Sequence, residues 1–149
     1  MIALIQRVSW AKVHVGERLI GAIEQGLLAF IGIVKGDDES NGVRLAQRLL
    51  AYRVFADDEG RMNRSLTDVG AGLLLVPQFT LAADTRSGNR PGFSTAAEPE
   101  RARILFNALV EQARRRHARV SAGQFGEHMR VSLTNDGPVT FWLESGPPL

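Results

Sequence analysis

Two short polar segments interrupt apolar stretches of the sequence, and both could supply backbone groups to a reaction. The first is Pro77-Gln78-Phe79-Thr80, in which Thr80 carries the one hydroxyl group. A threonine nucleophile needs an adjacent base. The sequence offers none there, so one interpretation is an ordinary threonine at the end of a strand. The other is that a distorted strand aims successive N–H groups outward, because two such donors form an oxyanion hole.

The second segment, residues 135–140 (NDGPVT), begins 55 residues after Thr80. Between two strands such a segment is ordinarily a turn. The Gly137–Pro138 bond allows an alternative, because X-Pro bonds are cis in only ~5–6% of cases in folded proteins and such bonds usually persist for a reason. A cis bond here would turn carbonyl oxygens in one direction with no side chain in the way.

Other common catalytic groups are scarce. The chain has no cysteine, which excludes thiolate catalysis, cysteine-ligated zinc, iron–sulfur clusters and disulfides. Its three histidines, His14, His117 and His128, are isolated from one another, and the acidic clusters at 37–39 and 57–59 lie in expected turns. Phosphate-binding, dinucleotide-binding, serine-hydrolase and zinc-protease motifs do not occur. We therefore expect neither a metal nor a cofactor.

The positive charges are almost all arginine. Lys12 and Lys35 are the only lysines, and a sequence pI of about 9.7 accompanies a formal net charge of only +2. Residues 86–119 carry eight arginines against three glutamates. Arginine suits phosphate, so one side of the molecule could meet a polyanion. An arginine-rich bias of a high-GC genome explains the same composition equally well.

Strands are expected to hold the two polar segments. Alternating residues predict strands at 2–10 and 12–15, which pair with each other and are followed by a turn at Gly16-Glu17. The apolar run 26–34 suits a strand buried on both faces. A further core strand at 72–76 runs into Pro77, which cannot donate to a ladder, so this strand should bulge or change partner there.

Two amphipathic helices are also predicted. The first covers residues 41–53, with Ser40 as its N-cap. The second begins at Pro99 and ends in the cations of residues 114–117, which suit the negative end of the helix dipole. The remaining segments are expected to be a turn at 57–60, an irregular stretch at 82–97, and strands at 119–124, 129–133 and 139–143.

These elements add up to an α+β fold, in which two main helices pack on a mixed, strongly curved sheet. The chain has 149 residues, 44% of them hydrophobic, and no linker or repeat, which predicts one domain spanning 1–149. No apolar run approaches the ~18–20 residues of a membrane span, and the N-terminus lacks the layout of a signal peptide. We therefore expect a cytoplasmic protein that does not enter membranes.

The two polar segments together carry a family resemblance. Residues 78–81 (QFTL) and 135–140 (NDGPVT) are similar to the paired signature of the D-aminoacyl-tRNA deacylases, the D-tyrosyl-tRNA deacylase family. Either motif alone is weak evidence, but the similarity runs the whole length of the chain. The further matches are Ile5-Gln6-Arg7-Val8, Met62-Asn63, Leu81-Ala82-Ala83-Asp84-Thr85, Arg90-Pro91 with Phe93, and Met129-Arg130-Val131-Ser132-Leu133.

The resemblance implies a barrel-like α+β fold and a two-fold homodimer with active sites at the interface. It implies hydrolysis of the ester that links a D-amino acid, or glycine, to the 3′-terminal adenosine of tRNA. Gly137 and Pro138 match the family's cis Gly-Pro pair, which enters the pocket of the partner subunit. Its carbonyls would accept hydrogen bonds from the substrate's α-ammonium group. An L side chain would then meet the backbone, whereas a D side chain would point to solvent.

The resemblance also assigns roles to individual residues. The implied catalytic segment is Gln78, Phe79 and Thr80, with an oxyanion hole made by backbone N–H groups around Phe79 and Thr80. The substrate's ribose 2′-hydroxyl would help to position or activate water. By position in the motifs, Met129 lines the adenosine pocket and Arg7 braces the Gly-Pro loop across the dimer.

The chain departs from the family pattern at two positions. Pro77 stands where the commonest family motif has serine. A mechanism based on the backbone tolerates proline there, whereas a mechanism that uses the serine hydroxyl does not. Gly92 follows Pro91 where a small hydroxyl residue is expected. Two other functions stay open: an ester hydrolase in which Thr80 is acylated, and a non-catalytic tRNA-binding module that uses the arginines of residues 86–119.

Overall fold

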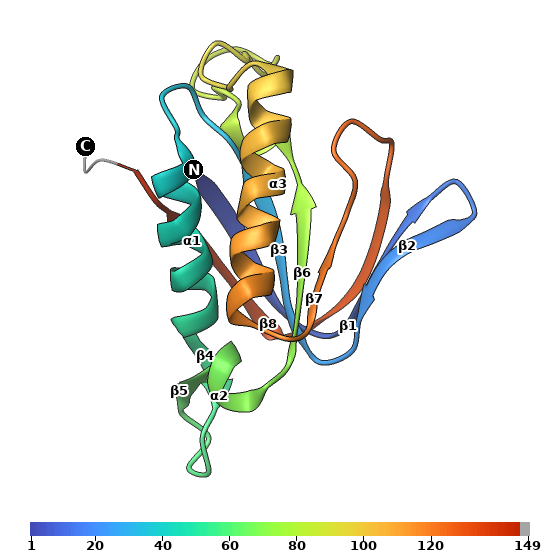
Figure 1. Cartoon of the computed structure of the whole chain (residues 1–149), viewed down its shortest axis with the longest axis vertical. Helices are drawn as coiled ribbons and strands as arrows, with labels where there is room; N and C mark the ends of the chain where they lie inside the picture. Colours follow the sequence, from blue (N-terminus) through green and yellow to red (C-terminus); the bar gives the residue numbers. More distant parts are fainter. Residues whose placement is uncertain (147–149) are drawn as a thin grey trace.

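The computed structural model describes residues 1–146 and has an α+β fold, as predicted (Figure 1). The main sheet runs in the order β2-β1-β3-β6-β7, and β8 pairs with the free edge of β1. Its strands are β1 (Ile2–Val15), β2 (Arg18–Ile23), β3 (Gly26–Gly32), β6 (Gly72–Pro77), β7 (Val120–Ala122) and β8 (Arg130–Glu144). The two main helices are α1 (Glu39–Ala51) and α3 (Pro99–Arg116).

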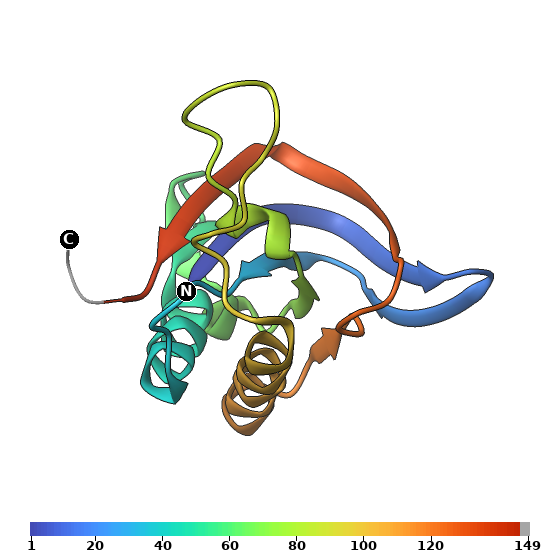
Figure 2. The same cartoon turned by 90° about the horizontal axis from the view of Figure 1, so that it is seen from above.

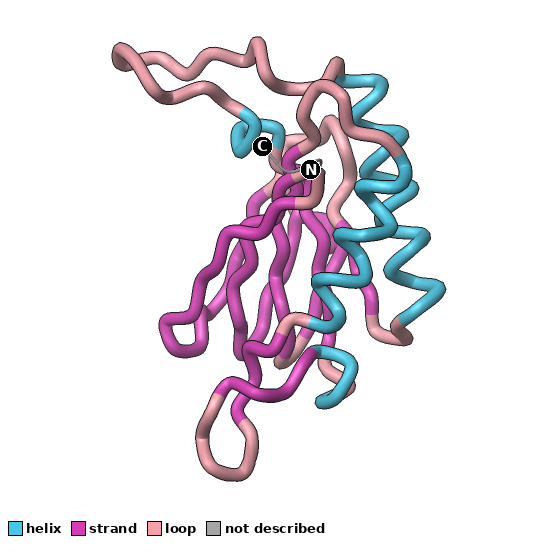
Figure 3. The backbone as a smooth tube through the Cα atoms, turned by 90° about the vertical axis from the view of Figure 1, so that its left-hand side faces the viewer, coloured by secondary structure: helices cyan, strands magenta, loops and turns pink. Residues whose placement is uncertain are grey.

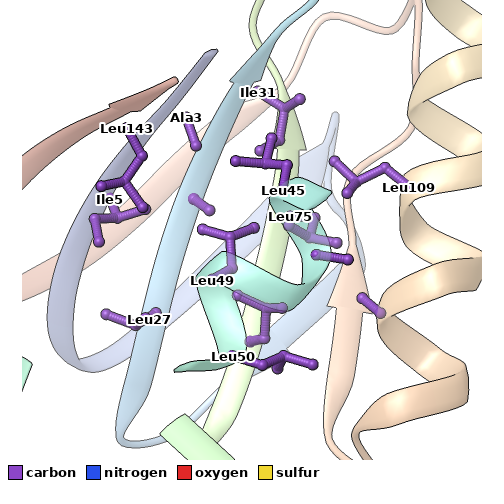
Figure 4. Packing of buried hydrophobic residues seen from close by; sticks show 14 of the residues in the cluster. Ala3, Ile5, Leu27, Ile31, Leu45, Leu49, Leu50, Leu75, Leu109 and Leu143 are labelled. Atoms are coloured by element: carbon purple, nitrogen blue, oxygen red, sulfur yellow. The ribbon is translucent and has the colours of Figure 1, made fainter. Parts of the chain in front are cut away.

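The sheet is strongly curved, and each of its faces buries apolar side chains. Seen from above, β1 and β8 arch over β3, while α1 and α3 lie beneath it (Figure 2). The larger core fills the helix-covered face (Figure 4) and includes Ile5, Leu27, Ile31, Leu45, Leu49, Leu75 and Leu109. The smaller core on the other face includes Val8, Ala11, Val13, Leu28, Leu74 and Val76. Successive side chains of β3 enter different cores, which explains its unbroken apolar run.

In two places, two strands predicted from the sequence are one long strand in the structure. Residues 2–10 and 12–15 do not pair with each other but form β1, and the strand that returns after the turn at Gly16 is β2. Residues 129–133 and 139–143 both belong to the span of β8, which begins at Arg130. The predicted pairing of residues 2–10 with residues 12–15 was wrong because one strand of a strongly curved sheet can pair with different neighbours along its length. The first half of β1 pairs with β3, and its second half pairs with β2.

Helix α1 begins earlier than predicted, with Asp38 and not Ser40 as its N-cap. The Asp38 side chain accepts the N–H of Asn41 (3.2 Å), and the Asn41 side chain accepts the N–H of Asp38 (2.8 Å). Two orphan donors are satisfied by this reciprocal arrangement, which a serine two residues later cannot match. Helix α3 begins at Pro99, as predicted.

Strand β6 ends at Pro77 and neither bulges nor changes partner. The N–H of Gln78 still donates to the carbonyl of Ile31 in β3 (2.8 Å), and the chain then turns into the 3₁₀ helix η1 (Phe79–Ala82). The segment after η1 has no helix of its own, as predicted, and is tied down by single bridges.

A small hairpin surrounds the turn predicted at 57–60. It comprises β4 (Arg53–Ala56) and β5 (Met62–Ser65), and the one-turn helix α2 (Leu66–Val69) follows it. These three elements were not predicted. The hairpin lies at one end of the sheet, and the long loop after η1 lies at the other (Figure 3). None of the helices in residues 1–146 is long and apolar enough to cross a membrane.

Candidate active site

A cavity of about 650 Å³ opens where β6 ends. Its lining is mostly apolar and comes from the junction of β6 and η1, from residues 93–99 and from residues 125–131. Three of the residues predicted for the site line this cavity: Gln78, Phe79 and Met129. The lining does not include the other four, Arg7, Thr80, Gly137 and Pro138. Thr80 follows Phe79 in η1, so the predicted site residues fall into two groups. Gln78, Phe79, Thr80 and Met129 belong to the cavity region, whereas Arg7, Gly137 and Pro138 lie in another part of the sheet.

Helix η1 is seated on a glycine of the neighbouring strand. A Cβ atom added at Gly32 would lie 2.9 Å from Cβ of Leu81 and 3.4 Å from the carbonyl oxygen of Gln78. Only a residue without a side chain lets η1 approach β3 so closely. The N–H of Gln78 fixes the start of the turn through its bond to Ile31. Gly32 and Ile31 together determine where the amides of η1 lie.

The first N–H groups of η1 are available donors. The first amides of any helical turn have no acceptor within that turn, and within residues 1–146 those of Phe79 and Thr80 bond to no other segment. Two adjacent N–H donors on a fixed turn are the arrangement that stabilises a developing oxyanion. The hydroxyl of Thr80 is differently placed, because it accepts a hydrogen bond from the side-chain amide of Gln78. An amide donor cannot act as a base.

An aromatic pair stands at the cavity rim. The ring of Phe79 contacts the ring of Phe93, with centroids 5.2 Å apart and an interplanar angle of 44°. Phe93 belongs to the long loop after η1. Bonds between Asp84 and Gly92 cross-link this loop, and the Arg86 guanidinium bonded to Asp84 holds the pKa of that carboxyl well below its usual range.

The second group surrounds an outward loop in the middle of β8. Gln6 pairs with Thr140 and Val8 pairs with Asn135, so residues 136–139 have no partners in β1 and lie opposite Arg7. Arg7 donates to the carbonyl oxygen of Asp136 (Nε, 3.1 Å) and to that of Val54 in β4 (2.7 Å). All these contacts are within one chain.

The side chain of Asn135 fixes the base of the same loop by hydrogen bonds. Its amide donates to the carbonyl oxygens of Arg7 (2.9 Å) and Val139 (3.0 Å). The Gly137–Pro138 bond is cis, and both residues are exposed. Gly137 has φ +150°, and an added Cβ would lie 2.6 Å from the backbone nitrogen of Val139. Position 137 therefore requires glycine.

The two groups lie toward opposite ends of the sheet. Arg7 is in register with Leu27 of β3, and Leu27 is in register with Leu73 of β6. Pro77, where the cavity begins, lies four residues farther along β6, which is about 13 Å of strand. The bond from Arg7 to Val54 ties the Gly-Pro loop to the hairpin end of the molecule. One chain therefore does not bring its own Gly137–Pro138 to its own cavity.

Sequence reasoning missed several residues of the cavity. Phe93 was noted in the resemblance without a role, and Phe125 was not singled out, although both line the cavity. His128 also lines it, beside Glu127. The sequence feature that could have pointed to Gly32 is its position as a glycine near the end of the apolar run 26–34. Within residues 1–146, no three side chains of His, Asp or Glu lie close enough together to hold a metal ion.

Comparisons with known proteins add an independent line of evidence. The family model described as D-Tyr-tRNA(Tyr) deacylase matches residues 4–144. A D-aminoacyl-tRNA deacylase of Xanthomonas oryzae pv. oryzae is 62% identical over 144 residues, which cover 96% of this chain and 99% of the relative.

Two solved structures are similar to the chain. The c-Myc DNA unwinding element binding protein superposes with a TM-score of 0.93 at 37% identity, covering 98% of this chain and 99% of that one. A probable eukaryotic D-amino acid tRNA deacylase superposes with a TM-score of 0.83 at 15% identity, covering 96% and 98%. The second likeness is one of fold.

Proposed function

Because this chain belongs to the D-Tyr-tRNA(Tyr) deacylase family, we propose that it hydrolyses the ester bond of D-aminoacyl-tRNA in the cytoplasm. The products are the free D-amino acid and tRNA. The observation that carries the proposal is a pair of adjacent amides without partners in residues 1–146, that of Phe79, which lines a nucleoside-sized cavity, and that of Thr80, which follows it in η1. The chain acts as one domain.

The cavity receives the 3′-terminal adenosine. Its volume of about 650 Å³ is within the usual range for small-molecule sites, and its lining is mostly apolar with a few polar groups, as is usual for a site that takes a purine base. Met129 packs beside the base. Its sulfur lies 2.8 Å from the position of a Cβ added at Gly123, so Gly123 makes room for that side chain.

The reaction uses backbone groups and water. Water attacks the ester carbonyl carbon, and the N–H groups of Phe79 and Thr80 stabilise the negative oxygen that develops there. The bond between that carbon and the ribose 3′-oxygen then breaks, and the 3′-oxygen leaves as a hydroxyl, taking up the proton that the attacking water loses. The substrate's 2′-hydroxyl positions the water. Thr80 is not the nucleophile, because within residues 1–146 its hydroxyl bonds to the amide of Gln78 and to no carboxylate or imidazole that could act as a base.

The second half of the site comes from a second copy of the chain. A chain's own Gly137–Pro138 loop lies about 13 Å along the strands from the start of its cavity. A two-fold dimer supplies the loop to each cavity from the partner. Arg7 then acts on the loop of its own chain, holding it in the shape that it presents to the partner.

The outer face of the sheet offers an apolar surface for this dimer. Leu4 is in register with Phe30 on one side and with Trp142 on the other, so the three side chains share a face. Trp142 is 50% exposed. A large exposed aromatic residue on such a face is typical of an interface.

Selectivity follows from the exposed Gly-Pro carbonyls. They accept hydrogen bonds from the substrate's α-ammonium group, so the α-carbon has one orientation. An L side chain then collides with the loop, a D side chain points to solvent, and glycine has no side chain to exclude. Both D-aminoacyl-tRNA and glycyl-tRNA are therefore substrates.

Deacylation of matched D-aminoacyl-, L-aminoacyl- and glycyl-tRNA tests the proposal. We expect release of D-amino acids and glycine and no release of L-amino acids above the spontaneous rate. Equal rates with D and L substrates would contradict the selectivity. The absence of release from any substrate would contradict the activity.

A nucleic-acid-binding function without catalysis is the second candidate. It is favoured by the name of the 37%-identical DNA unwinding element binding protein and by the arginines of residues 86–119. This function predicts equal binding of charged and uncharged tRNA, affinity for duplex DNA, and no ester cleavage. Gel-shift and deacylation assays on one preparation distinguish the two.

A further inference from the structure

We propose that the side chains of Phe79 and Phe93 form a stacking platform for the nucleobase that precedes the terminal adenosine of the substrate. The proposal rests on the function argued above and names a second subsite of the same site. It gives a binding role to two rings, whereas the chemistry uses only the backbone of Phe79.

Both rings are open to solvent. Phe79 is 58% exposed and Phe93 is 42% exposed, although phenylalanine usually contributes to the core. The rings touch each other, with centroids 5.2 Å apart, so they form one continuous aromatic surface. Exposed apolar surfaces of this kind mark binding sites.

The platform is continuous with the cavity. Phe79 and Phe93 both line the cavity that receives the terminal adenosine. A strand that ends in this cavity leaves it across its rim. The aromatic surface at that rim is therefore within reach of the next base of a single-stranded 3′ end.

The structure holds Phe93 in position despite its exposure. On one side, Asp84 and Gly92 exchange two backbone hydrogen bonds (2.7 and 2.9 Å). On the other side, the N–H of Lys35 donates to the carbonyl oxygen of Thr95 (3.0 Å). A ring anchored on both sides loses little conformational freedom on binding, so more of the stacking energy appears as affinity.

A nucleobase fits this surface better than an amino-acid side chain does. Every base has a π-face, and stacking on aromatic side chains is tolerant of sequence. The same loop carries the exposed Arg90, which forms no ion pair in residues 1–146, whereas Arg86 is held by Asp84. A phosphate linked to the stacked base therefore has a cation available three residues from Phe93 in the same loop.

The probe is an RNA hairpin with a single-stranded CCA end, in which 2-aminopurine replaces the base before the terminal adenosine. Stacking quenches its fluorescence. We expect quenching on binding to the wild-type protein. The Phe93→Ala variant should bind about 5- to 150-fold more weakly and lose the quenching, and Phe93→Tyr should restore both. Leu19→Ala, at a position that is 51% exposed in β2, should behave as wild type.

Adenosine 5′-monophosphate distinguishes the platform from the cavity. Phe93 also lines the cavity, so Phe93→Ala should weaken binding of the mononucleotide, but much less than it weakens binding of the hairpin. An equal loss with the mononucleotide and the hairpin would overturn the proposal, as would wild-type binding without quenching.

Deacylation by the wild-type protein separates this proposal from the proposed function. Quenching that depends on Phe93, in a protein that releases no amino acid, would support the platform and contradict the enzyme. Deacylation without quenching would do the reverse.

Discussion

The two interrupted strands of this protein present their backbones in opposite ways. Where β6 ends, the chain turns so that the amides of Phe79 and Thr80 have no acceptor in the described part of the chain, residues 1–146. In the middle of β8, the chain loops outward. The Arg7 side chain donates a hydrogen bond to the carbonyl oxygen of Asp136, and the Asn135 side chain donates one to the carbonyl oxygen of Arg7, so both side chains hold the loop in place. The end of β6 offers N–H donors beside a cavity, whereas the loop in β8 exposes Gly137 and Pro138 at its tip. In the proposed mechanism, side chains support both regions and main-chain groups perform the chemistry.

Replacing Phe79 with proline tests the donor region most directly. Proline removes one N–H group, and the backbone of Gln78 (φ −142°, ψ 83°) lies outside the helical region that a following proline disfavours. The Phe79→Ala variant loses the ring but keeps the N–H group. We expect kcat of Phe79→Pro to be about 100- to 1000-fold below that of Phe79→Ala, the usual effect of losing one oxyanion donor. Equal kcat values for the two variants would remove the amide of Phe79 from the mechanism.

Replacing Gly137 with alanine tests the exposed tip. The new Cβ would lie 2.6 Å from the nitrogen of Val139, at a φ of +150° that side chains rarely adopt. The displaced carbonyls should lower kcat/KM for D-aminoacyl-tRNA by about 100-fold. Gly16→Ala is the matched control, since Gly16 also has positive φ (+57°) but has open space around it and lies in a distant turn. Comparable losses in both variants would indicate general destabilisation.

Mixing the two defective chains then determines whether the regions act across subunits. A heterodimer of Gly137→Ala and Phe79→Pro has one site with an intact η1 and an intact Gly-Pro loop. Random assembly should restore about a quarter of wild-type activity. A site formed within one chain would gain nothing from mixing.

Local signals predicted much of the fold and less of the site. Pro99 marked the start of α3, and the apolar run at 26–34 marked β3, because both signals are contained in adjacent residues. The continuity of β8 was missed, since it depends on the Asn135 side chain bonding to Arg7 and Val139.

The cavity could not be predicted from neighbouring residues. Phe79, Phe93 and Phe125 come from three segments, and only the tertiary fold brings them to one lining. The family resemblance did lead to Phe79 and Met129, because it carries information about such distant contacts.

Arg7 should matter through hydrogen bonds to the backbone more than through its ion pair. It is 3.4 Å from the half-exposed carboxylate of Asp136, and pairs of this kind contribute little. Arg7→Lys cannot reach both carbonyls, of Asp136 and of Val54, so we expect about 10-fold lower kcat/KM and about 1 kcal/mol lower free energy of unfolding. Asp136→Asn should stay within about 0.5 kcal/mol of wild type. Denaturant unfolding and initial rates provide both values, and a larger effect of Asp136→Asn would reverse the assignment.

Thr80 should show the smallest effect, because only its backbone belongs to the donor region. Thr80→Ala keeps the N–H group and removes a hydroxyl that is bonded to Gln78. We expect kcat to fall by less than about 10-fold, since the oxyanion contact remains. If Thr80 were acylated instead, removing its hydroxyl would abolish turnover, and mass spectrometry of the quenched wild-type reaction would detect the acyl-enzyme. Thr80→Ala removes a side-chain hydroxyl, whereas Phe79→Pro removes a backbone N–H group from the adjacent residue of η1. The ratio of the kcat values of these two variants therefore measures how far catalysis depends on the main chain.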